Sequence, residues 1–379
     1  MANVKKKVLS IFQERKGMHA PDFLLLITIF LLLIFGLIFL SSASSVFSYV
    51  KFGDAYHFFK NQVINLILGI VVFWFFIQID YREWRKYAFG FLIFSVFLLI
   101  LVFIPGLSAA WGKSRSWIDI FGFSLQPSEF VKLSFLLYLS AWLEARKEEL
   151  SEVEAGIGPF VAVLGVIALF MIMQPDVGTL SIVTITALIV YYIGGGKIKH
   201  IIAIVLIGIV AFGFMVQVRP YQLNRFKCMM DPQFDPQGVC YQVNQSLIAV
   251  GSGGIFGRGI GDSRQKFMYL PEVSGDSIYA IIAEESGLIM SVILVLLFIF
   301  LFFRGYMIAK KAPDDFGRIL AIGIVSWISV QAIINIGGVI NLMPMTGVPL
   351  PFISYGGSAI LSVMAASGIL VNISRQTKE

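Results

Sequence analysis

Asp276 is the side chain that the sequence places best for proton transfer. It lies in LPEVSGDSIYAIIAEESG, where a polar stretch meets a long apolar run. The first turn of a helix stabilises a negative charge, so we expect this carboxylate to be ionised and able to accept a proton. Glu272 shares its face if the helix begins four residues earlier. An ordinary acidic residue at a helix start is the alternative interpretation.

Glu129 and Lys132 form a second candidate pair in QPSEFVKLSFLLYLSAWL. Pro127 suits the first position of a helix, which then puts the two ionisable side chains on one face. Ionisable groups inside a membrane are costly, so they face a cavity or each other. The pair is either a structural ion pair or the polar floor of a site for a charged head group.

Basic side chains cluster in two segments outside the apolar runs: Lys113, Arg115, Arg258, Arg264 and Lys266. Arg and Lys bind diphosphate groups well, although lipid phosphates are an alternative partner. The second segment, GSGGIFGRGIGDSRQKF, is rich in glycine, which lets a backbone approach a ligand closely.

Other polar residues have two interpretations each. Glu284 and Glu285 either extend a polar path below Asp276 or pair within the protein, and Asp176 suits a turn or a helix cap. Cys228 and Cys240 are either reduced or joined, and a bond would contribute about 3 kcal/mol in the chain-entropy model. The histidines show no metal-ligand spacing.

The composition indicates which elements must position these residues. The chain has 379 residues, of which 58% are hydrophobic and 14% charged, whereas soluble domains have roughly 25% charged residues. Continuous apolar runs of about 20 residues can cross a bilayer as helices. We therefore predict an all-α integral membrane protein with ten transmembrane helices, at 22–43, 58–79, 87–105, 127–145, 157–174, 177–194, 199–217, 277–303, 318–341 and 352–373.

The distribution of Lys and Arg predicts cytoplasmic termini. The run from Phe23 is then a retained first span, and the chain is one membrane domain, 1–379, with cytoplasmic tails at 1–21 and 374–379. The segment 218–276, between spans seven and eight, becomes a large extracytoplasmic loop. Two further Gly- and Pro-rich segments fall on the same side, which favours a composite site facing outward.

The residues above resemble the SEDS family (shape, elongation, division and sporulation) along nearly the whole chain. The resemblance rests on QPSEFVKL, YQVNQSLIAVGSGGIFGRGIGDSRQKF, LPE with the following acid, AEESG and GVPLPFISYGGSA. SRQK and the C-terminal LVNISR favour the FtsW branch over the sister RodA branch. The chain departs from the family where Ser274-Gly275 replaces His-Thr and where Ser116 replaces an arginine.

The resemblance implies a ten-helix peptidoglycan glycosyltransferase that polymerises lipid II during cell division and releases undecaprenyl pyrophosphate. The essential acid of the family maps onto Asp276. We expect substrate binding from Arg115, Trp117, Glu129, Lys132, Gln245, Ser246, Arg264, Lys266, Glu272 and Glu285.

The same resemblance implies the bacterial plasma membrane as the location and a class b penicillin-binding transpeptidase, with other divisome membrane proteins, as partners. No nucleic acid is expected. A divalent cation, Mg²⁺ or Mn²⁺, could help to neutralise the diphosphate, although the sequence shows no complete ligand set. A lipid II flippase, an elongation-type (RodA-like) polymerase and a scaffold without chemistry are the alternatives.

Overall fold

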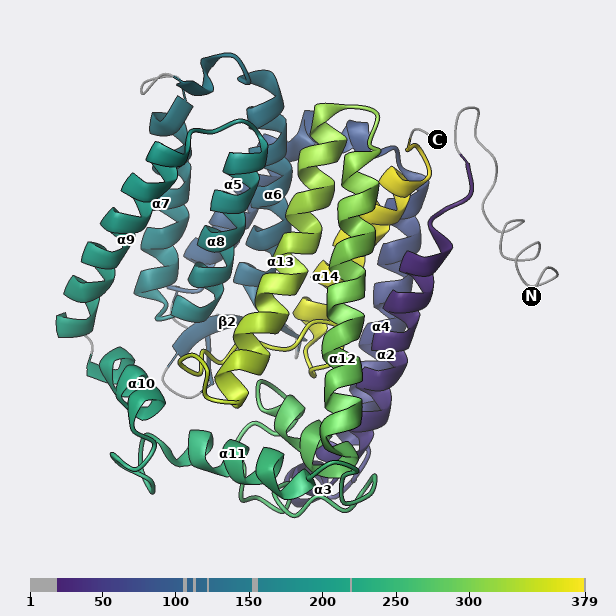
Figure 1. The fold of residues 1–379 in the computed structure, drawn as a ribbon, viewed down its shortest axis with the longest axis vertical. Coiled ribbons are helices and arrows are strands. Elements are labelled where there is room, and N and C mark those ends of the chain that lie inside the picture. Colours follow the sequence, from purple (N-terminus) through teal and green to yellow (C-terminus); the bar gives the residue numbers. More distant parts are fainter. Residues whose placement is uncertain are drawn as a thin grey trace.

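The apolar runs form a bundle of long helices in the computed structural model, which describes residues 19–104, 108–111, 114–120, 123–151, 156–218 and 220–377. Figure 1 shows these helices side by side. They are α2 (Phe23–Ala43), α4 (His57–Gln78), α5 (Tyr81–Leu101), α6 (Pro127–Ala145), α7 (Gly158–Met173), α8 (Val177–Ile193), α9 (Ile198–Val218), α12 (Ile278–Lys310), α13 (Asp315–Val339) and α14 (Gly357–Ser374).

Within the described chain, six of the helices are long and apolar enough to cross a membrane: α2, α4, α5, α12, α13 and α14. The chain is therefore a mostly helical, multi-pass membrane protein. Every predicted span overlaps one of the long helices. The largest difference at a helix start is at α5, which begins at Tyr81 rather than at residue 87 because Asp80 caps it and accepts the main-chain N–H of Arg82 at 3.0 Å. At the other ends, α12 continues furthest beyond its predicted span, to Lys310 rather than 303. Basic side chains near a helix end can extend to the interface, so YREWRK is compatible with the first turns.

The prediction of an all-α fold is wrong for one segment between α5 and α6. Three short antiparallel strands lie there in the order β1–β2–β3: β1 (Ser108–Trp111), β2 (Ser114–Ile120) and β3 (Phe123–Leu125). Ile118 pairs with Ser108 on one side and with Leu125 on the other. The last strand leads through Gln126 into α6, whose first residue is Pro127, as the sequence predicted.

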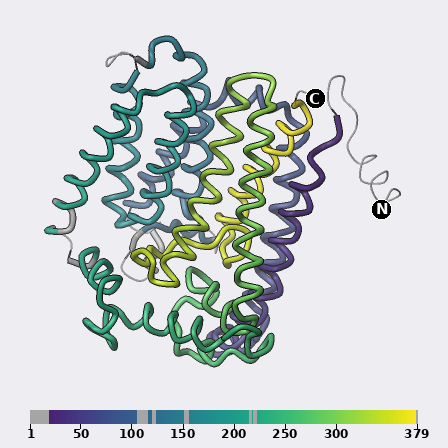
Figure 2. Tube along the Cα trace, in the orientation of Figure 1, coloured from purple at the N-terminus to yellow at the C-terminus, as the bar shows by residue number. Residues whose placement is uncertain are grey.

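Three shorter helices lie together at one end of the bundle: α3 (Ser45–Phe52), α10 (Pro220–Met230) and α11 (Tyr241–Gly253). The described chain ends lie at the opposite end of the bundle (Figure 2). There, the main-chain N–H of His19 donates to the carbonyl of Arg375 at 2.8 Å. A short 3₁₀ turn at Glu149–Ser151 follows α6. The polar segment 218–276 thus contains helices of its own and covers one end of the bundle.

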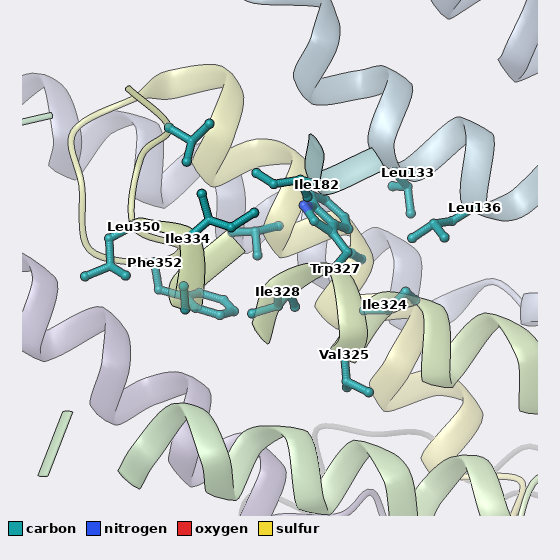
Figure 3. Packing of buried hydrophobic residues seen from close by; sticks show 14 of the residues in the cluster. Leu133, Leu136, Ile182, Ile324, Val325, Trp327, Ile328, Ile334, Leu350 and Phe352 are labelled. Atoms are coloured by element: carbon teal, nitrogen blue, oxygen red, sulfur yellow. The ribbon is translucent and has the colours of Figure 1, made fainter. Parts of the chain in front are cut away.

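Helices α13 and α14 form the centre of the bundle, because 78% and 83% of their apolar windows are buried, against 17% for α4 at the periphery. Figure 3 shows Trp327 of α13 among Leu133 and Leu136 of α6, Ile182 of α8 and Phe352 of the segment before α14. Lipid tails are as apolar as these side chains, so close van der Waals packing must supply much of the stabilisation. A rigid α13 can therefore hold polar groups in fixed positions.

Helix α12 is interrupted near its N-terminal end, at Gly287, whose φ of 73° lies in the left-handed region. The glycine-rich segment crosses the helix at this interruption. The main-chain N–H groups of Arg258 and Gly259 donate to the carbonyls of Glu284 and Glu285, both at 3.0 Å, and Leu288 donates to Gly254 at 2.9 Å. These glycines therefore allow the backbone of the loop to approach the backbone of α12. The sequence analysis expected them to allow a close approach to a ligand.

Candidate active site

Asp276 lies in a turn that precedes α12. The helix begins at Ile278, and the main-chain N–H groups of Gly275 and Ser277 donate to the carbonyl of Glu272 at 2.9 and 3.2 Å. Glu272 itself has a positive φ of 51°. The expectation that Glu272 and Asp276 share one face of a helix is therefore wrong, because the chain folds back between them.

Hydrogen bonds from three sides fix the position of Asp276. Gln242 of α11 donates from Nε2 to Asp276 Oδ1 at 3.2 Å and to the Ser277 hydroxyl at 3.1 Å, and that hydroxyl donates to Oδ1 at 3.4 Å. From α13, the side-chain amide of Asn335 donates to the main-chain carbonyl of Asp276 at 2.8 Å. The same nitrogen donates to the carbonyl of Val348 at 2.8 Å. The acid is thus held between α11, α13 and the segment before α14.

Arg225 of α10 faces the carboxylate of Asp276 across Gly347. A Cβ at position 347 would lie 3.6 Å from Asp276 Oδ2 and 3.9 Å from Arg225 Nη2. Gly347 has a φ of 79°, a conformation that side chains disfavour. The glycine therefore leaves space beside an acid and a guanidinium, where a ligand atom can meet both.

The electrostatic surroundings raise the pKa of Asp276 to about 7. Burial is the largest cause, the negative charge of Glu272 adds to it, and Arg225 opposes it. The sequence places Asp276 at the start of a helix, and the acid lies directly before Ser277, the N-cap of α12; its pKa is raised because the carboxyl group is buried. A carboxyl group with a pKa near neutrality suits general base catalysis, since it can both take up and release a proton.

Glu129 and Lys132 form the predicted ion pair, with Lys132 Nζ 2.7 Å from Glu129 Oε1. Both side chains are only 2% exposed, so the charges depend on each other and on nearby dipoles. Lys132 also donates to Gln331 Oε1 at 2.7 Å, and Gln331 Nε2 donates to the carbonyl of Pro349 at 2.8 Å. Gln331 therefore links the ion pair by hydrogen bonds to the segment that carries Gly347.

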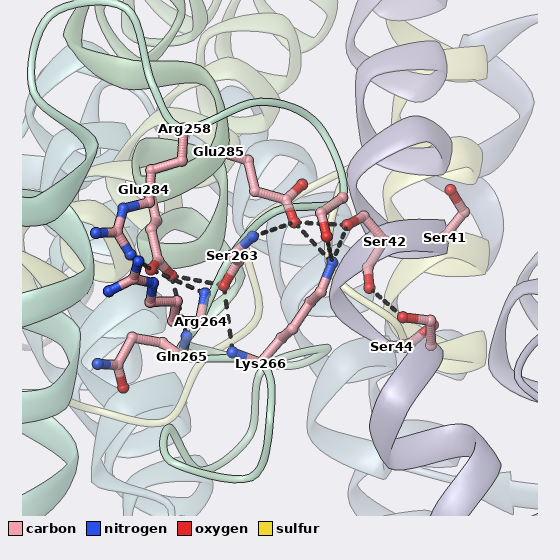
Figure 4. Close-up of polar contacts among 12 residues, drawn as sticks. Ser41, Ser42, Ser44, Arg258, Ser263, Arg264, Gln265, Lys266, Glu284 and Glu285 are labelled. Carbon is pink, nitrogen blue, oxygen red and sulfur yellow. Dashed lines mark hydrogen bonds and ion pairs between the residues drawn. The ribbon is translucent and has the colours of Figure 1, made fainter.

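Basic residues of the glycine-rich segment and two acids of α12 form a polar cluster that also includes Ser42 of α2 (Figure 4). Lys266 Nζ lies 3.1 Å from Glu285 Oε1 and donates to the Ser42 hydroxyl at 3.0 Å. Glu284 accepts hydrogen bonds from the Ser263 hydroxyl at 2.5 Å and from the main-chain N–H of Arg264 at 3.0 Å. This cluster fastens the glycine-rich segment to the bundle.

Lys266 and Glu285 are both buried within the polar cluster. Lys266 is only 4% exposed and Glu285 only 1%, and the two are bound to each other. Glu284 also accepts a hydrogen bond from Arg258 Nη1 at 3.4 Å. Both acids of α12 are thus paired within the protein, which is the second of the two interpretations that the sequence left open. Arg264 has an exposed side chain, and its main-chain N–H is what bonds Glu284.

Comparison with known proteins agrees with this architecture. A sequence model of the cell cycle protein family that covers FtsW, RodA and SpoVE matches residues 22–379. The chain belongs to this family. Stage V sporulation protein E of Bacillus subtilis is 41% identical over 359 residues, which cover 95% of this chain and 98% of that protein. The probable peptidoglycan glycosyltransferase FtsW of Geobacter metallireducens is 36% identical over 363 residues, covering 96% and 97%.

Solved structures share the fold of this family member. A chain of a peptidoglycan synthase complex, described as coordinating polymerization and crosslinking, superposes with a TM-score of 0.75 at 23% identity, covering 94% of this chain and 98% of that one. The rod shape determining protein RodA of Thermus thermophilus superposes with a TM-score of 0.70 at 22% identity, covering 95% and 98%. At these identities the agreement establishes the fold.

Four further residues expected from the family resemblance lie on β2 and α11. Arg115 and Trp117 are on β2, where Trp117 is partly buried and pairs with Ala109; the side chain of Arg115 lies outside the described residues. Gln245 follows Gln242 by one turn of α11 and is partly buried, and Ser246 is fully buried. Their roles in substrate binding remain predictions.

Near the site, the structure decides one open alternative and confirms one prediction. Cys228 and Cys240 form a disulfide. Asp176 caps α8, since its Oδ1 accepts the main-chain N–H of Thr179 at 3.1 Å, and its Oδ2 accepts from the Ser128 hydroxyl at 3.0 Å. Both features stiffen segments next to the bundle end where Asp276 lies.

Sequence reasoning missed the closest partners of Asp276: Arg225, Gln242, Ser277, Asn335 and Gly347. One signal was present, because Gln331 and Asn335 are amides four residues apart in an otherwise apolar run, which puts them on one face of α13. No comparable signal marked Arg225, which comes close to Asp276 only through the fold.

Proposed function

We propose that this chain is a peptidoglycan glycosyltransferase that polymerises lipid II into glycan strands and releases undecaprenyl pyrophosphate. The single observation that carries the proposal is Asp276, a half-buried carboxyl group with a pKa near neutrality that faces Arg225 at the end of the bundle. The names of its FtsW relatives support the activity, and the shared fold supports the architecture.

Asp276 acts in this mechanism as the general base. It takes the proton from the hydroxyl group of the acceptor sugar as the hydroxyl oxygen forms a bond to the anomeric carbon of the donor. The bond between that carbon and the diphosphate oxygen breaks, and the electron pair leaves on the diphosphate. Gln242 and Asn335 keep the carboxylate in place, so that little reorganisation accompanies the reaction.

Arg225 neutralises the diphosphate leaving group. A guanidinium group donates two parallel hydrogen bonds to phosphate oxygens, which fixes their direction as well as their charge. In the proposal Arg225 takes the role that the sequence assigned to Lys266, since Lys266 is bound to Glu285, whereas the exposed side chain of Arg264 remains a further cation for the diphosphate. Arg115 of β2 remains a second cation in the proposal.

Any divalent cation that takes part would be held largely by oxygens of the donor diphosphate. Within the described residues, no three His, Cys, Asp or Glu side chains come together as a metal site. Mg²⁺ commonly keeps several waters and binds substrate phosphates with few protein ligands. The Mg²⁺ or Mn²⁺ requirement therefore remains a prediction, tested by adding a chelator to the polymerisation assay.

The membrane placement follows from the same chemistry. The polyprenyl tail of the donor lies in lipid between helices, while its diphosphate reaches the bundle end that carries Asp276. We propose ten spans in the bacterial plasma membrane, with both chain ends in the cytoplasm and 218–276 outside. The pairing of His19 with Arg375 at the opposite end of the bundle supports an even number of spans.

A class b penicillin-binding transpeptidase is the proposed partner during cell division. One solved structure that shares this fold belongs to a complex described as coordinating polymerization and crosslinking. A polymerase and a crosslinking enzyme act on the same strand, so their association would keep the product close to the second enzyme. Co-purification of the two membrane proteins tests this part of the proposal.

The deciding experiment is glycan synthesis by purified protein reconstituted with labelled lipid II, with and without the transpeptidase. Wild type should form long strands, and Asp276→Asn should lower the rate on the order of 10²–10⁴-fold, the usual contribution of a general base. Asp262→Asn, which changes an exposed acid of the same outer segment, should retain activity. Strands from Asp276→Asn at the wild-type rate, or relocation of lipid II without polymerisation, would overturn the proposal; the second result would favour a flippase.

A further inference from the structure

The Cys228–Cys240 disulfide joins the two helices that hold the side-chain partners of Asp276. Arg225 and Cys228 are separated by about one turn on α10, and Cys240 lies two residues before Gln242 of α11. Both cysteines are buried, at 1% and 0% exposure. The bond therefore links the helix of the guanidinium to that of the amide, at positions close in sequence to both groups.

The two helices are not equally well anchored. Helix α11 packs against α12 and α13 and buries Val243, Ser246 and Ala249. Helix α10 packs mainly along α9, and among its described apolar side chains Leu223, Phe226 and Met230 are exposed, at 37%, 38% and 79%. A helix with so little buried apolar surface needs another constraint to keep one of its side chains at a fixed site.

Two hydrogen bonds assist the disulfide near the end of α10. Asn341 donates from Nδ2 to the carbonyl of Met229 at 3.1 Å, and Asn244 of α11 donates to the carbonyl of Pro232 at 2.9 Å. Hydrogen bonds of this kind open and close in solution, because water can replace either partner. The disulfide is the covalent link between α10 and the anchored α11.

We propose that the Cys228–Cys240 disulfide is a positioning element of the active site, which holds Arg225 against Asp276 and makes activity depend on oxidation of this cysteine pair. The inference rests on the proposed function, in which Arg225 binds the diphosphate. Cleavage of the bond frees α10 from α11, and Arg225 then spends less time at the carboxyl group. Both donor binding and the protonation of Asp276 change as a result.

The sign of the protonation effect follows from the groups that face Asp276. Glu272 of its own turn raises its pKa, and Arg225 of α10 lowers it. Gln242 of α11 and Asn335 of α13 are neutral. Loss of Arg225 from the site therefore raises the pKa of Asp276 further, and the acid limb of the rate profile moves to higher pH.

The test compares the oxidised wild type with Cys228→Ser/Cys240→Ser in the lipid II polymerisation assay across pH. We expect kcat/KM to fall about tenfold, the order expected for a lost charged hydrogen bond, with the acid limb at higher pH. Arg225→Gln should show the same pH displacement. Adding both serines to Arg225→Gln should cause no further displacement, because the disulfide acts through Arg225.

A phosphine reductant supplies the control for the substitutions. It should reproduce the loss in wild type and leave the double serine variant unchanged. If the double variant keeps the wild-type rate and acid limb, or loses only thermal stability, the positioning role is overturned. If oxidised wild type makes no glycan, the proposed function fails instead. Infrared titration of the Asp276 carboxyl, identified against Asp276→Asn, then tests the disulfide independently, since reduction should raise its pKa.

Discussion

Asn335 donates from its side-chain nitrogen to the main-chain carbonyls of Asp276 and Val348, both at 2.8 Å. One side chain of the buried helix α13 thus sets the distance between the turn that carries Asp276 and the segment that carries Gly347. Gln331, one turn earlier on α13, holds the carbonyl of Pro349 in the same way and accepts from Lys132. The surroundings of Asp276 are therefore built on fixed amides of α13.

Replacement of Asn335 by Asp should lower kcat for polymerisation at least tenfold and change KM less. An ionised carboxylate cannot donate to either carbonyl and repels both, so the two segments separate. Asn335→Ser keeps one hydrogen-bond donor, so its kcat should lie between those of Asn335→Asp and wild type. Steady-state kinetics on lipid II check the order, together with thermal unfolding to show that each variant folds. Equal kcat values for Asn335→Asp and wild type would contradict the positioning role.

The rate of polymerisation should rise with pH through about 7, where Asp276 titrates, and level off above it. The base must be ionised to accept a proton, and burial keeps it protonated below this pH. The measurement is kcat/KM between pH 5 and 9. A profile that is flat across neutrality, or one that falls from pH 6 to 8, would show that this carboxyl is not the base.

The contribution of Asp276 to the stability of the fold should change with pH in the opposite direction to its contribution to the rate. A carboxyl whose pKa is higher in the folded state than in the unfolded chain stabilises the fold at low pH, and this contribution is lost as pH rises through the folded value. Asp276→Asn should therefore raise the Tm relative to wild type at pH 8 and have little effect at pH 4. Thermal unfolding in one detergent at both pH values checks this, with Asp262→Asn as the control.

Removal of Lys132 alone should cost more stability than removal of the whole ion pair. Lys132→Met leaves Glu129 buried without its cation, and such losses are typically about 3–5 kcal/mol. Glu129→Gln with Lys132→Met removes both charges and should recover most of the folded protein. Denaturation of the two variants in the same detergent measures the difference. Equal losses would mean that water or lipid head groups already neutralise Glu129.

The sequence was a good guide where neighbouring residues decide the structure. Pro127 begins α6, Asp176 caps α8, and Glu129 pairs with Lys132 because each relation spans only one helical turn. Long apolar runs likewise located the helices of the bundle, since no other element satisfies its backbone in lipid. The strands at 108–125 were missed because a short sheet needs pairing between segments, which composition does not reveal.

The environment of Asp276 could not be predicted, because it depends on contacts between distant segments. Arg225 and Asn335 lie on different helices on either side of Asp276 in the sequence, and only the packed bundle brings them together. Lys266 appeared available for a diphosphate, yet Glu285 and Ser42 bind it inside the polar cluster. Charge and spacing identify candidates, whereas burial and pairing decide which of them face a substrate.

Gly347→Ala should reduce polymerisation through the space between Asp276 and Arg225. The new Cβ would lie 3.6 Å from the carboxylate and 3.9 Å from the guanidinium, where we place the reacting atoms of the donor. The left-handed φ of 79° adds strain of about 1–2 kcal/mol for any residue with a Cβ. We expect kcat/KM to fall at least tenfold, with only a moderate fall in Tm.

Gly53→Ala separates the two causes, because Gly53 has a similar φ of 72° but no atom within 4 Å of the added Cβ. It should show the same strain and keep near-wild-type activity. Parallel measurement of Tm and kcat/KM for both variants therefore isolates the effect of filling the site. Equal losses of activity in the two variants would mean that backbone strain alone limits turnover. Full activity in Gly347→Ala would instead place the reacting atoms of the donor outside the space between Asp276 and Arg225.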